Sequence, residues 1–269
     1  MRTEDTIDTG GTRPEQSLFD LHGVTVRFGG LTALSEVSLT ARYREVHGVI
    51  GPNGAGKTTL FNVCCGFVRP EAGTIRVRGT PVTQPRPHQL ASLGIARTLQ
   101  GLGLFDGLTV LDNVLVGADR FRRSGFVSAL LGLRRSVADE TALRERADAV
   151  LRELDIHAYA DASPGSLPYP VRKRVALARA LVSEPELLLL DEPASGLGHD
   201  DLGELADLVR ALSDRMAVVL VDHHMDLVMS VCDRITVLDF GRVIASGRPD
   251  EIAADPAVIT AYLGEEARA

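Results

Sequence analysis

The sequence is poor in cysteine and contains no long apolar run. Its three cysteines are the adjacent Cys64 and Cys65 and the remote Cys232, and no CxxC spacing occurs. This pattern excludes a disulfide framework and favours reduced, packed thiols. Apolar runs such as Ala217–Val221 are far shorter than the ~20 residues that cross a bilayer, and the polar N-terminal segment lacks the apolar core of a signal peptide. We therefore expect a soluble, intracellular protein.

The sequence also has no excess of basic over acidic residues. Lysine and arginine number 29 against 36 aspartates and glutamates, which gives a formal net charge of −7. Nucleic-acid-binding proteins usually present a basic face, so we expect no nucleic acid among the partners. Hydrophobic residues make up 45% of the chain and the mean hydropathy is +0.07, which excludes general disorder. A chain of 269 residues then corresponds to one large or two small domains.

Hydrophobic periodicity divides the chain. Residues 1–17 are rich in threonine, glycine, proline and acids, and we expect them to form a flexible extension before a single domain at 18–269. From Thr109 to Val182 the pattern is helical, and strand patterns lie on both sides of it. The expected strands are Leu18–Phe28, Glu36–Thr40, Val46–Ile50, Thr74–Arg78, Glu186–Asp191, Met216–Val221 and Arg234–Asp239.

Short apolar strands that alternate with helices are typical of a largely parallel sheet covered on both faces. The sequence therefore predicts an α/β fold with an antiparallel β region from the N-terminal strands. The helical stretch, at about 101–183, is predicted to be an α-helical subdomain inserted between strands. After Asp191 we expect an amphipathic helix, with Asp201 and Glu204 forming a capping box at its start.

A glycine-rich loop follows the strand at Val46–Ile50 and matches G-x-x-x-x-G-K-[ST] at every required position. Glycines let backbone N–H groups turn towards phosphate oxygens, and the next helix adds its N-terminal dipole. Lys57 is expected to contact the β- and γ-phosphates, and the Thr58 hydroxyl to bind Mg²⁺. The predicted phosphate-binding residues are Gly51, Pro52, Asn53, Gly54, Ala55, Gly56, Lys57, Thr58 and Thr59.

A second motif is an apolar strand that ends in two acids, Asp191 and Glu192. Ligands of α/β sheets bind at the carboxyl ends of the strands, so both carboxylates are expected at the nucleotide. Asp191 would hold Mg²⁺, usually through water, and Glu192 would act as a general base on the attacking water. Alone, the pattern also fits a strand followed by an acidic turn. The phosphate loop favours the catalytic interpretation.

From Leu18 onward the sequence resembles the ATP-binding subunits of ABC transporters, in which these motifs are called Walker A and Walker B. Gln100 is similar to the Q-loop glutamine, His223 to the switch histidine, and Phe28 occupies the A-loop position. The resemblance implies that Gln100 senses Mg²⁺ and the attacking water. It also implies that His223 contacts the γ-phosphate and joins Lys57 and Glu192 in catalysis, and that Phe28 stacks on adenine. Each residue also has a plainer interpretation. Gln100 could be a solvated loop residue, His223 a capping or packed histidine, and Phe28 a core residue of its strand.

The resemblance extends to one branch of the family, the branched-chain amino-acid importers, in residues 28–34, 94–100 and 255–264 and in a helical insert at about 118–166. It implies ATP-driven uptake of branched-chain or similar amino acids through a membrane permease, with a substrate-binding protein as an indirect partner. The cassette would lie on the cytoplasmic face of the membrane. Alternatives are a transporter of another solute, an exporter, or a soluble ABC ATPase outside transport.

The signature segment departs from the family pattern. In the family an LSGGQ-type sequence binds the γ-phosphate held by the opposite subunit. The corresponding residues here are Leu167, Pro168, Tyr169, Pro170 and Val171. Pro168 has no hydroxyl and Pro170 has no N–H, so phosphate binding is weakened, although proline suits the first turn of a helix. We therefore expect a heterodimer with a second cassette, a paralogue whose signature is intact.

These interpretations predict one ABC-type cassette: a P-loop NTPase (RecA-like) core with an N-terminal antiparallel β region and an inserted helical subdomain. It would be an ATPase that uses ATP and Mg²⁺.

Leu102, Leu104 and Phe105 follow Gln100 in a loop. We expect these apolar side chains to be exposed as a surface that accepts a short helix of the permease.

Overall fold

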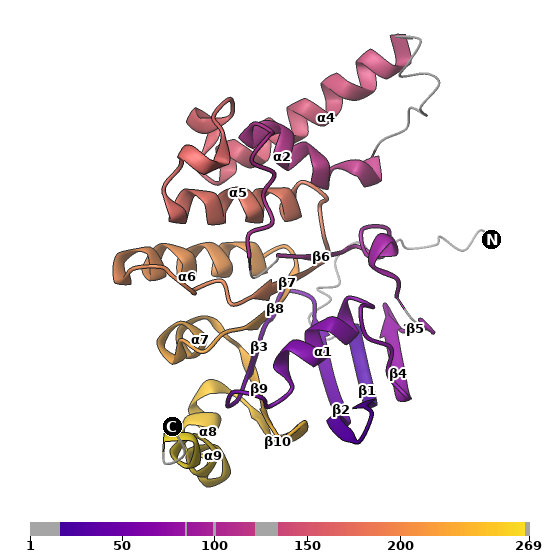
Figure 1. Cartoon of the computed structure of the whole chain (residues 1–269), viewed down its shortest axis with the longest axis vertical. Coiled ribbons are helices and arrows are strands. Elements are labelled where there is room, and N and C mark those ends of the chain that lie inside the picture. The colour runs from indigo at the N-terminus through magenta and orange to yellow at the C-terminus, as the bar shows by residue number, and fades with distance from the viewer. Residues whose placement is uncertain (1–16, 84, 99–100, 122–133, 267–269) are drawn as a thin grey trace, which may run out of the picture.

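A six-stranded sheet forms the centre of the fold in the computed structural model, which describes residues 17–83, 85–98, 101–121 and 134–266 (Figure 1). The strand order is β10-β9-β3-β8-β7-β6, with β10 antiparallel to β9 and the other neighbours parallel. The predicted α/β fold is confirmed. Its strands are β3 (Val46–Ile50), β6 (Ile95–Arg97), β7 (Leu187–Asp191), β8 (Ala217–Val221), β9 (Arg234–Asp239) and β10 (Arg242–Gly247).

A second, antiparallel sheet in the order β2-β1-β4-β5 lies beside the first. Its strands are β1 (Ser17–Phe28), β2 (Leu31–Arg42), β4 (Ala72–Val77) and β5 (Thr80–Pro81). Helix α1 (Lys57–Cys64) lies next to this sheet in Figure 1. Its residues Leu60 and Phe61 share one buried cluster with Leu34 of β2 and Leu189 of β7. This cluster joins the two sheets through α1. The predicted extension at 1–17 lies outside the described residues except for Ser17.

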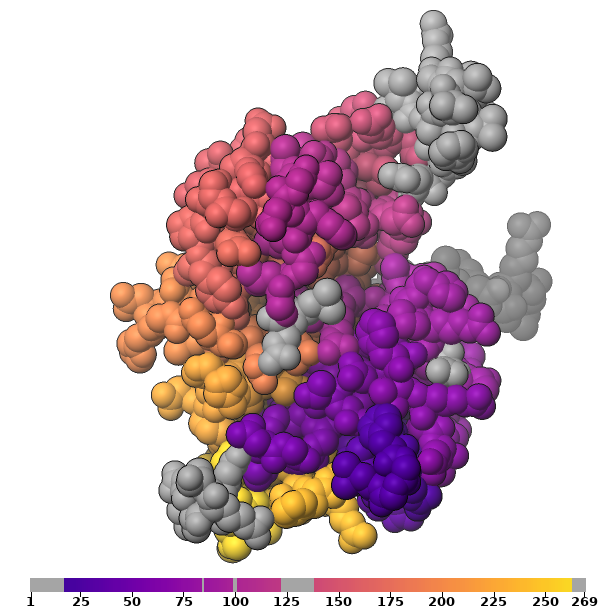
Figure 2. Space-filling view, in the orientation of Figure 1, coloured from indigo at the N-terminus to yellow at the C-terminus, as the bar shows by residue number. Residues whose placement is uncertain are grey.

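Of the remaining helices, α6 packs on the parallel sheet, α8 and α9 pack at its β10 edge, and α5 contacts β6 at the opposite edge. Helices α2, α4 and α5 pack on one another and gather at one end of the molecule, as Figure 2 shows, in the segment where the sequence predicts helices. No helix in the described ranges is long and apolar enough to cross a bilayer. The helices are α2 (Val110–Gly117), α4 (Arg134–Glu153), α5 (Tyr169–Leu181), α6 (His199–Ser213), α7 (Met225–Val231), α8 (Pro249–Ala253) and α9 (Pro256–Glu266).

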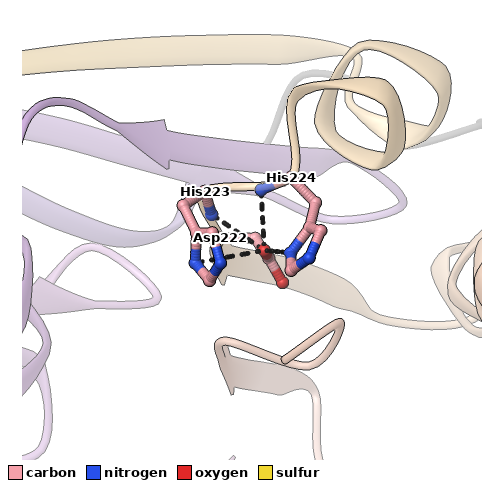
Figure 3. A group of neighbouring side chains, drawn as sticks. All are labelled: Asp222, His223 and His224. Atoms are coloured by element: carbon pink, nitrogen blue, oxygen red, sulfur yellow. Dashed lines mark hydrogen bonds and ion pairs between the residues drawn. The ribbon is translucent and has the colours of Figure 1, made fainter. Parts of the chain in front are cut away.

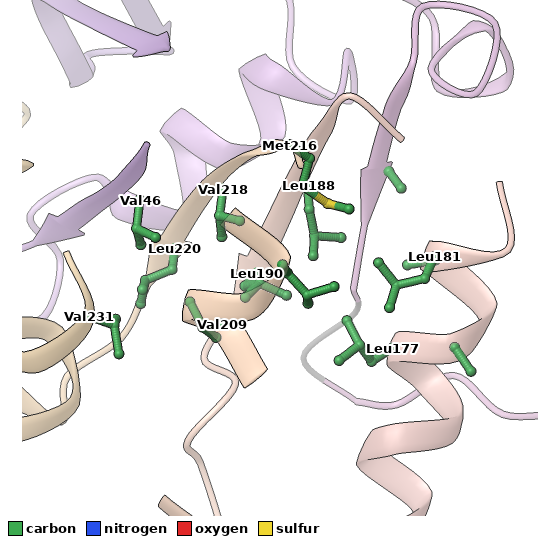
Figure 4. Packing of buried hydrophobic residues seen from close by; sticks show 14 of the residues in the cluster. Val46, Leu177, Leu181, Leu188, Leu190, Val209, Met216, Val218, Leu220 and Val231 are labelled. Atoms are coloured by element: carbon green, nitrogen blue, oxygen red, sulfur yellow. The ribbon is translucent and has the colours of Figure 1, made fainter. Parts of the chain in front are cut away.

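The four leucines of β7 divide between two cores. Leu188 and Leu190 belong to a cluster with residues of α5, α6 and α7, part of which Figure 4 draws. Leu187 and Leu189 belong to the cluster on the α1 side. Strands that are buried on both faces are uniformly apolar. This is why an unbroken run of leucines forms the strand β7, which ends at Asp191.

The cysteines are packed as predicted. Cys64 and Cys65 are buried at the end of α1, and Cys232 is buried after α7. Burial raises the pKa of Cys65 to about 11 and that of Cys232 to about 12.

The predicted capping box of α6 is wrong. This helix begins at His199 with Gly198 as its N-cap, so Asp201 occupies the third helical position. There its carboxylate accepts the Gly198 N–H at 3.2 Å. Glu204 pairs instead with Arg174 of α5. The pattern placed the start of the helix three residues too late because a glycine N-cap gives no side-chain signal.

Candidate nucleotide site

The glycine-rich loop turns sharply between β3 and α1. Gly51 has φ 150° and Gly56 has φ 104°, both outside the usual range of other residues. A Cβ atom at Gly51 would lie 2.1 Å from the carbonyl oxygen of Leu238, and one at Gly56 would lie 2.8 Å from that of Ala33. Both glycines are thus required by the close approach of neighbouring backbone. The motif is built as its spacing predicts.

The ammonium of Lys57 lies against this loop. It donates to the carbonyl oxygens of Gly51 at 2.6 Å and Pro52 at 2.8 Å. The Ala55 N–H also donates to the Pro52 carbonyl, at 3.1 Å, which closes the turn. Thr58 is exposed at the start of α1. A cation and a helix N-terminus therefore meet at the end of β3, an arrangement suited to a polyphosphate.

Asp191 ends β7 and is paired with a residue that the sequence patterns did not single out. Its Oδ2 accepts a hydrogen bond from Arg97 of β6 at 2.6 Å, and both side chains are almost fully buried. Arg97 also donates to Asn62 Oδ1 at 2.9 Å. Burial disfavours the charge on Arg97, but hydrogen bonds to Asp191 and Cys65 outweigh it and raise the pKa of the guanidinium. The ion pair fixes one oxygen of Asp191.

Glu192 follows in a left-handed backbone conformation with φ 48°. Its N–H donates to the carbonyl of Val221, the last residue of β8, at 2.8 Å. The chain therefore turns immediately after β7. This turn gives the two neighbouring acids different backbone positions, because Asp191 remains in the sheet whereas Glu192 does not.

Asp222 connects this turn to His223 (Figure 3). Its buried carboxylate accepts the backbone N–H groups of His223 at 2.8 Å and His224 at 2.9 Å, the His224 Nδ1–H at 2.7 Å, and the Ala194 N–H at 2.9 Å. The three side chains offer atoms within 4.8 Å that could hold a metal ion. Four N–H donors already use the Asp222 oxygens, so the cluster orders the loop instead.

Two exposed rings lie where the sequence predicts nucleotide contacts. The side chain of His223 is 59% exposed, which excludes a packed histidine. Phe28 is 53% exposed at the end of β1, which excludes a core residue. Gln100 lies outside the described residues.

Comparison with known proteins decides the family. The profile described as "ABC transporter" matches residues 34–195. The chain belongs to this family. A second profile, "Branched-chain amino acid ATP-binding cassette transporter", matches residues 242–268. The protein is thus an ATP-binding cassette, an ATPase subunit of a transporter, as the sequence predicts.

Individual relatives support the same family. "High-affinity branched-chain amino acid transport ATP-binding protein LivG" of Salmonella typhimurium is 39% identical over 252 residues, 93% of this chain and 99% of that protein. "Lipopolysaccharide export system ATP-binding protein LptB" of Haemophilus influenzae is 33% identical over 87% of this chain and 91% of that protein. A solved ATP-binding cassette of an ABC transporter in its ADP conformation has TM-score 0.79 and 28% identity, over 93% of this chain and 99% of its own.

The segment predicted to be the signature lies at the start of α5. Pro168 is the N-cap, Tyr169 is the first helical residue, and Pro170 is the second. The Arg172 N–H donates to the Pro168 carbonyl at 3.1 Å. Proline in the first turn is thus compatible with the helix. Since the first N–H groups of a helix have no intrahelical acceptor, the amides of Tyr169 and Val171 are the donors this segment offers.

The loop before α2 is only partly as predicted. Phe105 is 51% exposed, but Leu104 is partly buried and Leu102 is 7% exposed, so the prediction for Leu102 is wrong. The guanidinium of Arg179 on α5 donates to the carbonyls of Leu102 and Gly103 and draws that part of the loop inward.

Asn113 of α2 fixes the other half of the loop. This fully buried amide accepts the Phe105 N–H at 2.8 Å and donates to the Phe105 and Thr109 carbonyls. Phe105 is therefore exposed on a fixed backbone.

Proposed function

We propose that this cassette hydrolyses ATP to energise uptake of branched-chain or similar amino acids through a membrane permease. The observation that carries this proposal is the match to LivG over nearly the whole of both chains, together with the C-terminal match at 242–268. A substrate-binding protein would deliver the solute to the permease. An exporter is the second candidate because LptB is also a relative, but its identity and coverage are lower.

Nucleotide binding is assigned to the loop at 51–56 and the start of α1. The Lys57 ammonium would exchange its loop carbonyls for the β- and γ-phosphates, where opposite charge makes the contact stronger. Thr58 and Thr59, in the first turn of α1, would add hydroxyl and backbone donors. The exposed ring of Phe28 would stack on adenine.

Mg²⁺ fits the oxygen donors beside the loop. Thr58 offers a hydroxyl, and Asp191 offers the carboxylate oxygen that lies outside its pair with Arg97. Hydroxyl and carboxylate oxygens are ligands that Mg²⁺ prefers, with water and phosphate completing the shell. Gln100 would be a further ligand. When bound, Mg²⁺ would neutralise charge on the phosphates.

Hydrolysis is assigned to Glu192 and His223. The Glu192 carboxylate would accept a proton from the water that attacks the γ-phosphorus in line with the leaving oxygen. His223, on the loop ordered by Asp222, would donate a hydrogen bond to the γ-phosphate. Lys57 would stabilise the charge that develops on the leaving group.

Pairing with a second cassette completes each site, since the signature segment acts on the nucleotide of the opposite chain. With proline at 168 and 170, this chain offers the amides of Tyr169 and Val171 but no signature hydroxyl or glycine. We infer a heterodimer with a signature-intact paralogue.

The pair would lie on the cytoplasmic face of the membrane, held through Leu104 and Phe105 to a short permease helix.

Uptake of radiolabelled leucine by cells that lack the endogenous gene tests the proposal. Wild-type protein should restore uptake, and Glu192→Gln should not. Restoration of another solute's transport, or of export, without leucine uptake would refute the importer assignment. Co-purification from membranes identifies the permease and the second cassette.

A further inference from the structure

Lys173 lies on α5 where this helix passes the turn after β7. Its ammonium donates to the carbonyl oxygen of Pro193 at 2.6 Å and to that of Glu192 at 3.4 Å. Burial lowers the pKa of Lys173, and attraction to the carboxylates of Asp222 and Glu192 opposes this effect. A half-buried cation therefore contacts the carbonyl oxygens of two consecutive residues, the proposed catalytic base and the proline that follows it.

The turn that Lys173 contacts is fixed from a second direction by the end of β8. Glu192 N–H donates to the carbonyl of Val221, and Ala194 N–H donates to the carboxylate of Asp222. Glu192 also has a positive φ, a conformation that is unfavourable in a residue other than glycine and persists only where surrounding contacts impose it. Lys173 supplies a contact to this turn from the helical layer.

The helix that carries Lys173 begins with the signature segment. Tyr169 lies four residues earlier, one helical turn away, and its ring centroid is 5.5 Å from the Lys173 ammonium. The Tyr169 ring also packs on Gly196, where a Cβ atom would lie 2.9 Å from it. The first two turns of α5 thus touch the segment after β7 at two points, Pro193 and Gly196.

We propose that Lys173 is a positioning residue that ties the turn carrying Glu192 to the signature end of α5. The proposal rests on the base role proposed for Glu192. A helix moves as a unit, so a displacement of the signature segment reaches the Glu192 carboxylate through the bonds of Lys173. Without the ammonium, the turn keeps its bonds to Val221 and Asp222 but loses the contact with α5, so Glu192 is placed less accurately and hydrolysis falls while ATP binding continues.

The test compares Lys173→Met, Lys173→Arg and Arg174→Met in the assembled transporter. Arg174 is the matched control because it is the next cation on α5 but contacts Glu204 and the Leu154 carbonyl. Misplacement by about 1 Å can reduce catalysis about a hundredfold. We expect Lys173→Met to lower kcat at least tenfold with the ATP dissociation constant changed less than threefold. Lys173→Arg, which retains donors, should recover most of kcat, and Arg174→Met should retain it.

A double variant separates positioning from general support of the fold. If Lys173 acts through Glu192, adding Lys173→Met to Glu192→Gln should not lower the residual single-turnover rate further. A further tenfold loss, or an unchanged kcat in Lys173→Met, overturns the proposal while the base role of Glu192 stands. Wild-type kcat in Glu192→Gln alone refutes the base role instead. If Lys173→Met does not fold, Lys173→Gln, whose amide is too short for the same contacts, replaces it.

Discussion

The guanidinium of Arg97 lies 2.6 Å from Oδ2 of Asp191, with side-chain exposures of only 11% and 7%. Arg97 belongs to β6, a strand of three residues, and Asp191 ends the neighbouring β7. The ion pair holds the acidic end of one strand to the next. It also determines which oxygen of Asp191 can face a ligand.

Removing Arg97 should therefore destabilise the protein. Arg97→Met leaves a buried carboxylate without its partner, and the expected loss in free energy of unfolding is about 3 kcal/mol, measured by urea denaturation. Arg78→Met is the control, since the Arg78–Glu186 pair is exposed and should contribute less than about 1 kcal/mol. Equal losses in the two variants would contradict the importance of the buried pair.

Lys57 and Glu192 should give variants that differ in kind. Lys57→Ala removes the phosphate-binding cation and should abolish ATP binding, measured by fluorescent-nucleotide titration. Glu192→Gln should bind ATP normally but hydrolyse it at least a hundredfold more slowly, because general base catalysis contributes about 10²–10⁴-fold. An equal ATPase rate for wild type and Glu192→Gln in the assembled complex would refute the assignment.

The part of the loop before α2 that carries the exposed Phe105 and the partly buried Leu104 should dock the permease. Replacing Leu104 and Phe105 with aspartate should release the cassette from membranes, measured by sedimentation, while ATP binding remains. Ile259→Asp is the control, because Ile259 of α9 is 46% exposed outside this loop. Leu102 is unsuitable for this test because it is buried. Membrane association that survives in the double variant would place the docking surface elsewhere.

The two nucleotide sites of the proposed heterodimer should differ in rate. ATP bound by Lys57 and Glu192 faces the partner's intact signature, whereas the partner's ATP faces Pro168 and Pro170. Glu192→Gln should thus remove most ATPase activity of the whole transporter, and the equivalent change in the partner much less. Equal losses would show that the amides of Tyr169 and Val171 suffice.

His47 should make stability depend on pH. This buried β3 residue donates from Nδ1 to the Thr40 carbonyl and accepts from the Thr236 hydroxyl. Burial lowers its pKa from 6.5 to about 4. Between these values the unfolded chain binds a proton that the folded chain does not, so stability is lost as pH falls, by about 2 kcal/mol at pH 5.

Urea denaturation at pH 7 and pH 5 measures this effect. The loss on acidification should be smaller in His47→Gln than in wild type. His88→Gln, at an exposed histidine, should behave as wild type does. The same pH dependence in all three proteins would exclude His47 as its source.

The sequence predicted the elements whose patterns are local. Val46–Ile50 and Arg234–Asp239 are strands with the predicted bounds, because runs buried on both faces leave a continuous apolar signal. By contrast, the three residues of β6 are too few for a periodic pattern. Strand β10 lies at the edge of the sheet and only one of its six residues is buried, so its sequence shows neither a long apolar run nor a regular alternation.

Contacts between residues far apart in the chain could not be predicted from the sequence, for a different reason. Arg97 and Asp191 are 94 positions apart, and Lys173 meets Pro193 only because α5 crosses the end of β7. The residue type at one position does not indicate which distant residue it will contact. Leu102 was misjudged likewise, since Arg179, far along the chain, holds its backbone inward.

Because Cys64, Cys65 and Cys232 are buried, the rate at which their thiols are labelled measures local opening of this protein. Each sulfur is shielded in the native state, and the raised pKa of Cys65 and Cys232 keeps thiolate scarce near neutral pH. An alkylating reagent can then react only during excursions that expose α1 or the end of α7. The labelling rate at each position therefore reports how often that part of the cassette opens, and whether bound nucleotide slows it.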